Sequence, residues 1–306
     1  MLSHELEELP DNKPIRLRNV ICPYCGVAIT KETKTREHVI GSNFVPKGTL
    51  KDQWNLILNA CRSCNGRKAD LEDDISAISM QPDMRGQYYS PHPQLAVDAT
   101  HKAERTYSRY SRKPVAESNP RMTLQHEFAP GVTMTFNMVG QPQIAEDRAF
   151  ELAYRHFQAF FFLITYNHEE KRGWYWPGEF APIQTIARND WGNDVVRAFM
   201  QVTRHWQTRV VAITASQFFK LGIRKHPNEK MWSLAVEWNE NYRVIAVCGE
   251  EGSLRQFLSG LPKLRLDSLS ETPDSFVRAR TEQALKIKDD TLFDAGQCDG
   301  TDPAEA

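Results

Sequence analysis

Two closely spaced cysteine pairs constrain this 306-residue chain more than any other feature of its sequence. The first pair is Cys22 and Cys25, the second is Cys61 and Cys64, and 35 residues lie between them. Two C-x-x-C pairs are typical of a zinc site, because each short knuckle can turn both of its sulfurs toward one metal ion. We therefore expect one zinc ion held by four thiolates. Such a closed coordination sphere makes the zinc structural and not catalytic.

Two other interpretations of the cysteines fit less well. A disulfide framework is typical of secreted proteins, and the N-terminal segment MLSHELEELPDNK lacks the apolar stretch of a signal peptide. A redox C-x-x-C motif needs only one pair. Cys248 lies in the apolar run YRVIAVCG and is expected in the core, whereas nothing in the sequence gives Cys298 a role.

Composition excludes several classes of protein. Apolar residues make up 41% of the chain and charged residues 25%, which excludes a disordered or collagen-like protein. The longest apolar run, Phe157–Tyr166, is shorter than the roughly 20 residues that a membrane helix needs. We expect a cytoplasmic protein with no membrane partner and, from its length, about two domains.

The distribution of charge says more than the net charge of −1. Residues 31–68 hold eight Lys/Arg against three Asp/Glu, and residues 101–121 hold six against two. Basic segments inside a neutral chain are typical of a phosphate-binding surface, with solvated surface charge as the alternative. Residues 281–306 are acidic, with two Lys and seven Asp/Glu.

A second pattern runs between and after the cysteine pairs, TREHVIGSNFVPKG followed by WNLILNACRSCNGRKADLEDD. Its elements are, in order, Glu37-His38, Pro46 and Gly48, Asn55 or Asn59, the Cys61/Cys64 pair, Asn65 and Lys68. This order resembles the HNH endonuclease family, whose fold is the ββα-metal motif. The resemblance covers residues 20–81 and implies a similar fold there.

The resemblance implies a phosphodiester hydrolase that acts on DNA, or on RNA as the alternative. His38 would take the proton from the attacking water, which suits a group whose pKa lies near neutrality. Glu37 and Asn65 would bind a catalytic Mg²⁺ or Mn²⁺, because such hard cations prefer oxygen ligands. Arg67 and Lys68 would contact phosphate near the start of a helix, with a solvated face as the alternative.

Two positions depart from the family pattern. The last ligand is often His in the family, but here it is Asn65, which could instead cap a helix beginning at Gly66. The middle Asn usually lies nine residues before the last ligand and braces the loop that bears the general base, yet that position is Leu56. Asn55 is favoured over Asn59 for this role, because Asn-Leu matches the usual dipeptide.

The whole chain is expected to be α+β, with an N-terminal ββα-metal zinc-knuckle nuclease module and a larger α+β C-terminal domain of hairpins and helices. The expected parts are an N-terminal extension (1–19), the nuclease module (20–81), a basic linker (82–118), an α+β domain (119–267) and an acidic tail (268–306). Beyond the strands that the ββα-metal motif implies, helices are expected at 71–80, 101–116, 144–167, 190–207 and 253–259. A hairpin is expected at 122–139 and strands at 209–219, 232–238 and 242–248. Asp190 is expected to cap the fourth of these helices.

Three hypotheses about function follow. The first is an endonuclease of restriction, phage defence or mobile elements, in which residues 119–267 recognise or clamp DNA. The second is a zinc-dependent nucleic-acid-binding protein without cleavage, and the third is a toxin-type nuclease effector. Because one such active site cuts one strand, a homodimer is expected for an enzyme that cuts both.

Overall fold

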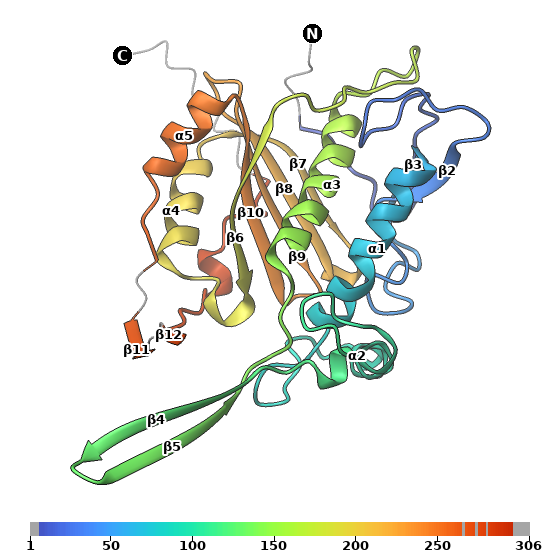
Figure 1. Cartoon of the computed structure of the whole chain (residues 1–306). Coiled ribbons are helices and arrows are strands. Elements are labelled where there is room, and N and C mark those ends of the chain that lie inside the picture. Colours follow the sequence, from blue (N-terminus) through green and yellow to red (C-terminus); the bar gives the residue numbers. More distant parts are fainter. Residues whose placement is uncertain (1–5, 265–266, 273–274, 280, 296–306) are drawn as a thin grey trace.

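The computed structural model describes residues 6–264, 267–272, 275–279 and 281–295, which form an α+β fold. Its centre is a five-stranded antiparallel sheet in the order β6-β10-β9-β8-β7. The strands are Glu179–Ala187 (β6), Gln207–Thr214 (β7), Phe219–Lys225 (β8), Trp232–Trp238 (β9) and Tyr242–Gly249 (β10). The helix Glu146–Ile164 (α3) lies on one face, and the helices Asp194–Thr203 (α4) and Glu251–Ser259 (α5) lie on the other (Figure 1).

Burial on both faces explains why the central strands are apolar at consecutive positions. In β10, Val244 and Ala246 belong to the core beneath α3, whereas Ile245 and Val247 belong to the core beneath α4 and α5. Every residue of β9 and β10 is buried. Strands covered on both sides lose the polar–apolar alternation of half-exposed strands. None of the helices in the described ranges is long and apolar enough to cross a membrane.

The N-terminal part contains the expected ββα arrangement. Strand Lys34–His38 (β2) pairs antiparallel with strand Leu56–Cys61 (β3), and helix Arg62–Ser79 (α1) follows β3 directly. A short strand, Ile15–Arg16 (β1), pairs with β3 in parallel. The helix expected at 71–80 is therefore the second half of a longer one that begins immediately after Cys61.

The ββα unit and the five-stranded sheet share one apolar core. This core contains Leu56 and Leu58 of β3, Phe157 and Phe160 of α3, and Val244 of β10. The boundaries predicted at 81 and 119 thus do not separate two cores. Residues 82–118 also fold against the rest, because Ala99 of the helix Pro93–Arg105 (α2) is fully buried in the same core.

Helix α2 corrects the prediction of a helix over 101–116. It begins earlier, where the imidazole of His92 accepts a hydrogen bond from the Gln94 amide, and it ends at Arg105. Tyr107 then pairs with Pro114 as an isolated bridge, and Val115–Glu117 form a 3-10 turn. The basic residues that follow Arg105 are therefore on a loop and do not form one helical face.

The predicted hairpin is confirmed. Strands Arg121–Ala129 (β4) and Val132–Val139 (β5) pair around Gly131, whose φ of +78° explains the glycine in the turn. The hairpin extends away from the body of the molecule (Figure 1). Its two ends are joined at the base, where the Gly140 amide donates to the Pro120 carbonyl at 2.8 Å.

Three predictions about the sheet region were incomplete or wrong. Strands β6 and β8 were not predicted. The strand expected at 209–219 is broken by a turn in which Ala215, Ser216 and Gln217 have φ values of 53°, 53° and 75°. The cap of α4 is Asn193 and not Asp190, because the Asn193 Oδ1 accepts hydrogen bonds from the amides at 195 and 196.

The predicted acidic tail is largely folded where the structure describes it. Strands Asp267–Thr272 (β11) and Ser275–Ala279 (β12) form a hairpin. Residues 281–295, which we call the C-terminal strap, lie against the sheet and bury Leu292. The strap is anchored where the Gly192 amide donates to the Gln283 carbonyl at 2.7 Å. The remainder of the predicted tail, with Cys298, lies outside the described residues.

Candidate functional site

The four expected cysteines come together at one end of the ββα unit. Cys61 ends β3 and Cys64 lies in the first turn of α1, while Cys22 and Cys25 belong to a knuckle that is closed by a hydrogen bond from the Gly26 amide to the Cys22 carbonyl. All four sulfurs lie within 4.8 Å of one another. Such a set of four sulfur donors could hold a zinc ion.

The thiols of this cluster do not share one pKa shift. Burial raises the pKa of the Cys22 thiol to about 11 and also raises the pKa of Cys64. Burial acts in the same direction on Cys61, but hydrogen bonds from Ser63 and Cys64 outweigh it and lower the pKa of Cys61 to about 6. Four thiolates this close would repel one another strongly, and only a cation among them makes their joint ionisation favourable.

The predicted catalytic residues line one cavity beside this cluster. The cavity measures about 320 Å³, and its walls include Glu37 and His38 at the end of β2, Asn65 from α1 and Lys102 from α2. The ββα order explains why Glu37, His38 and Asn65 lie close together, because β2 pairs with β3 and α1 begins directly after β3.

The His38 side chain lines this cavity and is exposed to solvent. Partial burial of the ring lowers the pKa of His38 below its usual value, and the nearby positive charge of Arg36 lowers it further. A neutral imidazole can accept a proton, so the side chain has the protonation state that a general base requires.

Glu37, in contrast, is buried, with an exposed fraction of 2%. Its Oε1 accepts a hydrogen bond from the Tyr24 hydroxyl at 3.1 Å and lies 3.0 Å from the Lys68 ammonium. These two contacts hold the carboxylate in one orientation at the wall of the cavity. An oriented carboxylate is well suited to bind a divalent cation.

Lys68 does not lie where the sequence predicted it. Its side chain is 1% exposed, and its ammonium lies between Glu37 and Glu72, at 3.0 and 2.6 Å. Burial lowers the pKa of Lys68, but Glu72 and Glu37 together outweigh burial and raise the pKa. The expectation that Lys68 contacts phosphate does not fit a side chain directed into the interior.

Arg67 remains near the surface, but it has an acidic partner. Its guanidinium forms a pair of hydrogen bonds with the carboxylate of Glu151 on α3, with Nη2 to Oε2 at 2.5 Å. A phosphate would have to compete with Glu151 for this side chain.

Asn65 lies inside the first turns of α1, whose N-cap residue is Cys61, so it does not cap a helix that begins at Gly66. Its Nδ2 donates to the Thr35 hydroxyl at 3.0 Å and more weakly to the Arg36 carbonyl at 3.4 Å. Because β2 holds the amide nitrogen, the amide oxygen is the atom that can meet a cation in the cavity.

The two candidate middle asparagines have different contacts. Asn55 binds both backbone groups of Ile40, accepting from its amide at 3.2 Å and donating to its carbonyl at 2.7 Å. Asn59 instead donates to the backbone of Asn19 at 2.8 Å. Asn55 therefore braces the loop that follows His38, whereas Asn59 fastens the segment before the first knuckle.

Sequence reasoning missed four charged residues of this cavity, Arg36, Glu72, Asp73 and Lys102. The Lys102 ammonium contacts the Asn43 carbonyl and the Ser76 hydroxyl, which are neutral acceptors. Burial lowers the pKa of Lys102 to about 8. The basic segment 101–121 contained this residue, but only the packing of α2 against the ββα unit shows that it lines the cavity.

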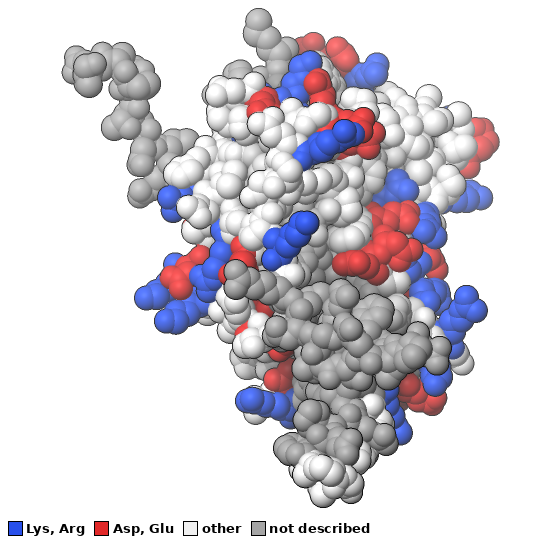
Figure 2. Space-filling view, turned by 60° about the vertical axis from the view of Figure 1, so that its left-hand side comes forward, with Lys and Arg blue, Asp and Glu red and all other residues white. Residues whose placement is uncertain are grey.

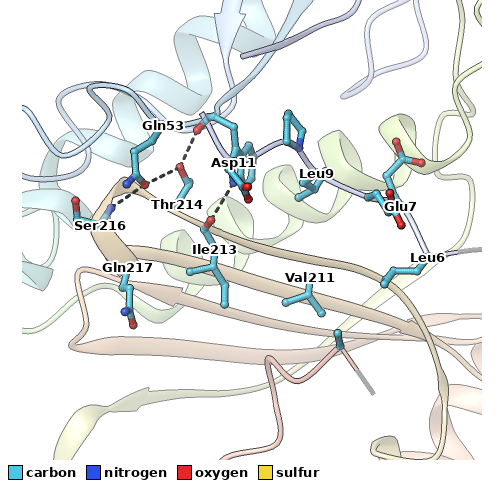
Figure 3. Close-up of a pocket in the computed structure, with 14 residues that line it drawn as sticks. Leu6, Glu7, Leu9, Asp11, Gln53, Val211, Ile213, Thr214, Ser216 and Gln217 are labelled. Carbon is cyan, nitrogen blue, oxygen red and sulfur yellow. Dashed lines mark hydrogen bonds between the residues drawn. The ribbon is translucent and has the colours of Figure 1, made fainter. Parts of the chain in front are cut away.

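A larger cavity, of about 780 Å³, lies at the outer edge of β7 and is a less suitable site (Figure 3). Residues from the N-terminal segment, including Leu6 and Leu9, line it opposite Val211 and Ile213. Trp54 donates its indole N–H to the Ile213 carbonyl at 2.9 Å. This cavity contains neither the cysteines nor His38, so we place the candidate site in the smaller one.

No family model, curated protein or solved structure matches this chain. The candidate site therefore depends on its own geometry and on the motif in the sequence.

Proposed function

We propose that this protein is an HNH-type endonuclease that hydrolyses phosphodiester bonds with a divalent cation. One observation carries the proposal. Glu37, His38 and Asn65 line a single cavity on a ββα unit, beside a cluster of four cysteines. An imidazole that can accept a proton and oxygen ligands for a divalent cation are groups that metal-assisted hydrolysis of a phosphodiester can use.

In this proposal each side chain has one task. His38 accepts the proton of the attacking water, and Asn55 holds the loop after it in place through Ile40. Glu37 and the amide oxygen of Asn65 bind Mg²⁺ or Mn²⁺, which would supply positive charge to the phosphate oxygens. Tyr24 and Lys68 orient Glu37 from behind.

Lys102, like Arg36, is a cation in the wall of this cavity that can meet a phosphate. Lys68 is occupied by two carboxylates, whereas the contacts of the Lys102 ammonium are to a carbonyl and a hydroxyl. Its charge is therefore less neutralised by direct partners. On the side of the molecule where α4 and α5 lie, acidic and basic side chains are intermixed (Figure 2).

The proposed zinc has a structural role. Four thiolates fill its coordination sphere, so the zinc has no open position for water, and the catalytic cation is a second, separately held ion. DNA is the proposed substrate and RNA the alternative. The proposed biological context is restriction, phage defence or mobile-element biology. For cleavage of both strands, the proposed active form is a homodimer.

The test is cleavage of supercoiled plasmid by the purified protein with Mg²⁺, with EDTA, and by His38→Ala purified in the same way. We expect nicked or linear product only from the parental protein with Mg²⁺. Plasmid binding without cleavage would favour the zinc-dependent binding protein instead. Equal cleavage by His38→Ala would show that the activity comes from a contaminant or from another site.

A further inference from the structure

A second cavity, of about 440 Å³, lies between the five-stranded sheet and the C-terminal strap, on the sheet face that α4 and α5 cover. Its volume falls in the range of roughly 300–1,000 Å³ that is usual for pockets that bind small molecules. Cross-strand neighbours form its floor, with Glu237 of β9 opposite both Lys220 of β8 and Arg243 of β10. Tyr89, Trp191 and Asp290 complete the wall from three other segments.

The floor of this cavity is charged and almost completely buried. Glu237 is 0% exposed and Arg243 is 2% exposed. Glu237 forms ion pairs with Lys220 at 3.0 Å and with Arg243 at 2.7 Å, and Arg243 also pairs with Asp290 of the strap. Arg188 pairs with Glu240 at the rim. Three cations and three carboxylates thus line the cavity, which gives a phosphate no net attraction.

Two polar atoms in the wall lack a protein partner although they are buried. They are Nη1 of Arg243, a donor, and Oδ1 of Asn189, an acceptor. A ligand that satisfies both atoms needs an acceptor and a donor of its own. A purely apolar ligand would leave both atoms unpaired.

Flat groups lie beside these atoms. The Arg243 guanidinium lies 3.5 Å from the centroid of the Trp191 ring, and the Arg188 guanidinium lies over the rings of Tyr89 and Trp191 at 4.8 and 5.1 Å. Aromatic rings and guanidinium planes are the surfaces on which proteins stack unpaired bases. We propose that this cavity binds a nucleobase, stacked on Tyr89 and hydrogen-bonded by Arg243 and Asn189.

The base pocket and the candidate nuclease cavity lie on either side of one turn. Glu240 lines the base pocket, and its neighbour Asn239 donates to the Phe44 carbonyl at 3.1 Å and to the Ser79 hydroxyl at 2.8 Å. Phe44 also lines the cavity of His38. A base extruded from a nucleic-acid strand is therefore the source we favour. That choice of source rests on the proposed function, whereas binding of the base does not.

Isothermal titration calorimetry of the full-length His38→Ala variant with nucleosides measures binding to the pocket in a protein that we expect not to cleave nucleic acid. We expect nucleosides to bind and ribose 5-phosphate not to bind. Tyr89→Ala and Asn189→Ala should each weaken binding by roughly tenfold. Tyr110→Ala is the matched control, because Tyr110 is exposed and lies outside the cavity, and it should leave the affinity unchanged.

A second arm identifies the source of the base. A duplex with one base opposite an abasic site should bind more tightly than the fully paired duplex, and Tyr89→Ala should abolish that difference. Nucleoside binding without this difference would assign the pocket to free nucleosides. The proposal is overturned if no nucleoside binds at millimolar concentration, or if both pocket variants bind like the control. The plasmid assay is independent, since its failure would leave these titrations unaffected.

Discussion

The ββα unit and the five-stranded sheet lie against the same apolar core but contribute to it very differently. Every residue of β9 and β10 is buried, whereas Glu37 is the one buried residue of β2. The sheet is covered by helices on both faces. The ββα unit leaves one side open as a cavity and has the cysteine cluster at its end. From this comparison we propose that apolar burial dominates the stability of the sheet, whereas the ββα unit also depends on a metal at its cysteines.

Cysteine substitutions should separate the two regions most clearly. Cys22→Ser or Cys64→Ser should unfold the protein or make it insoluble, because metal binding contributes on the order of 10 kcal/mol to the folding of small zinc units. Cys248→Ser is the matched substitution in the sheet, where the thiol is fully buried. It should cost about 1–3 kcal/mol, as expected for a buried hydroxyl without a partner.

Zinc analysis and thermal melting measure both effects. A protein that contains almost no zinc yet melts like the parent would refute the structural role of the metal. A Cys248→Ser variant as damaged as Cys64→Ser would remove the contrast between the two regions.

Two histidines make the same comparison for function. His38 is exposed, and His38→Ala should lower cleavage by roughly a hundredfold or more while melting stays nearly unchanged. His156 of α3 is fully buried among Phe44, Phe219 and Trp238, so His156→Ala should lower stability by about 2–4 kcal/mol through the space it leaves. Equal losses of stability in the two variants would support a structural role for His38.

The second metal should exchange freely, unlike the zinc. Activity should vanish in EDTA and return with Mg²⁺ or Mn²⁺, under mild treatment that leaves the zinc in place. Asn65→Ala should lose most activity, whereas Asn65→His should keep some, because the HNH family that the motif resembles often has His at this position. Undiminished cleavage by Asn65→Ala would mean that its role is limited to the hydrogen bond with Thr35.

Lys102 should have a smaller effect that depends on pH. Its ammonium is charged below a pKa of about 8, so its contribution to phosphate binding should be present below that pH and fall above it. Lys102→Ala should lower cleavage by roughly tenfold and Lys102→Arg should restore activity at high pH. Lys113→Ala, an exposed control, should match the parent. An identical pH profile for the parent and Lys102→Arg would argue against a titrating lysine.

The smallest effect should come from the β4–β5 hairpin. Its two strands contact mainly each other, and its base is closed by the backbone hydrogen bond from the Gly140 amide to the Pro120 carbonyl. Replacing residues 121–139 by a short Gly-Ser linker should leave the melting temperature nearly unchanged. A large loss of stability would show that the hairpin belongs to the core after all.

The resemblance to the HNH family predicted the ββα order of elements, which the structure contains. The cysteine spacing predicted that the four thiols meet, which is confirmed. Glu37, His38 and Asn65, which the resemblance singled out, line one cavity, and their catalytic roles stay predictions. The Asn-Leu dipeptide favoured Asn55 over Asn59, and the contacts of Asn55 with both backbone groups of Ile40 agree with that choice.

The errors occurred where distant segments decide the outcome. The sequence predicted that Lys68 lies at the surface and contacts phosphate. In the fold, packing of β2 against α1 brings Glu37 to the Lys68 ammonium, which also pairs with Glu72. Strand β6 has Pro182 within it and little alternation, so no local pattern marked it as a strand. The C-terminal strap looked like an acidic tail because one of its anchors, Asp290, is acidic and pairs with the distant Arg243.

The shared core also has a consequence for how the chain is synthesised. The contact between Phe44 and Asn239 joins residues 195 positions apart, so the ribosome needs roughly 10–40 s to produce the second partner after the first. During that interval all four cysteines are already available, while Leu56 and Leu58 have no sheet to cover them. Zinc captured at this stage would hold the early segment in shape until its partners emerge, which makes the supply of metal during translation important for the yield of folded protein.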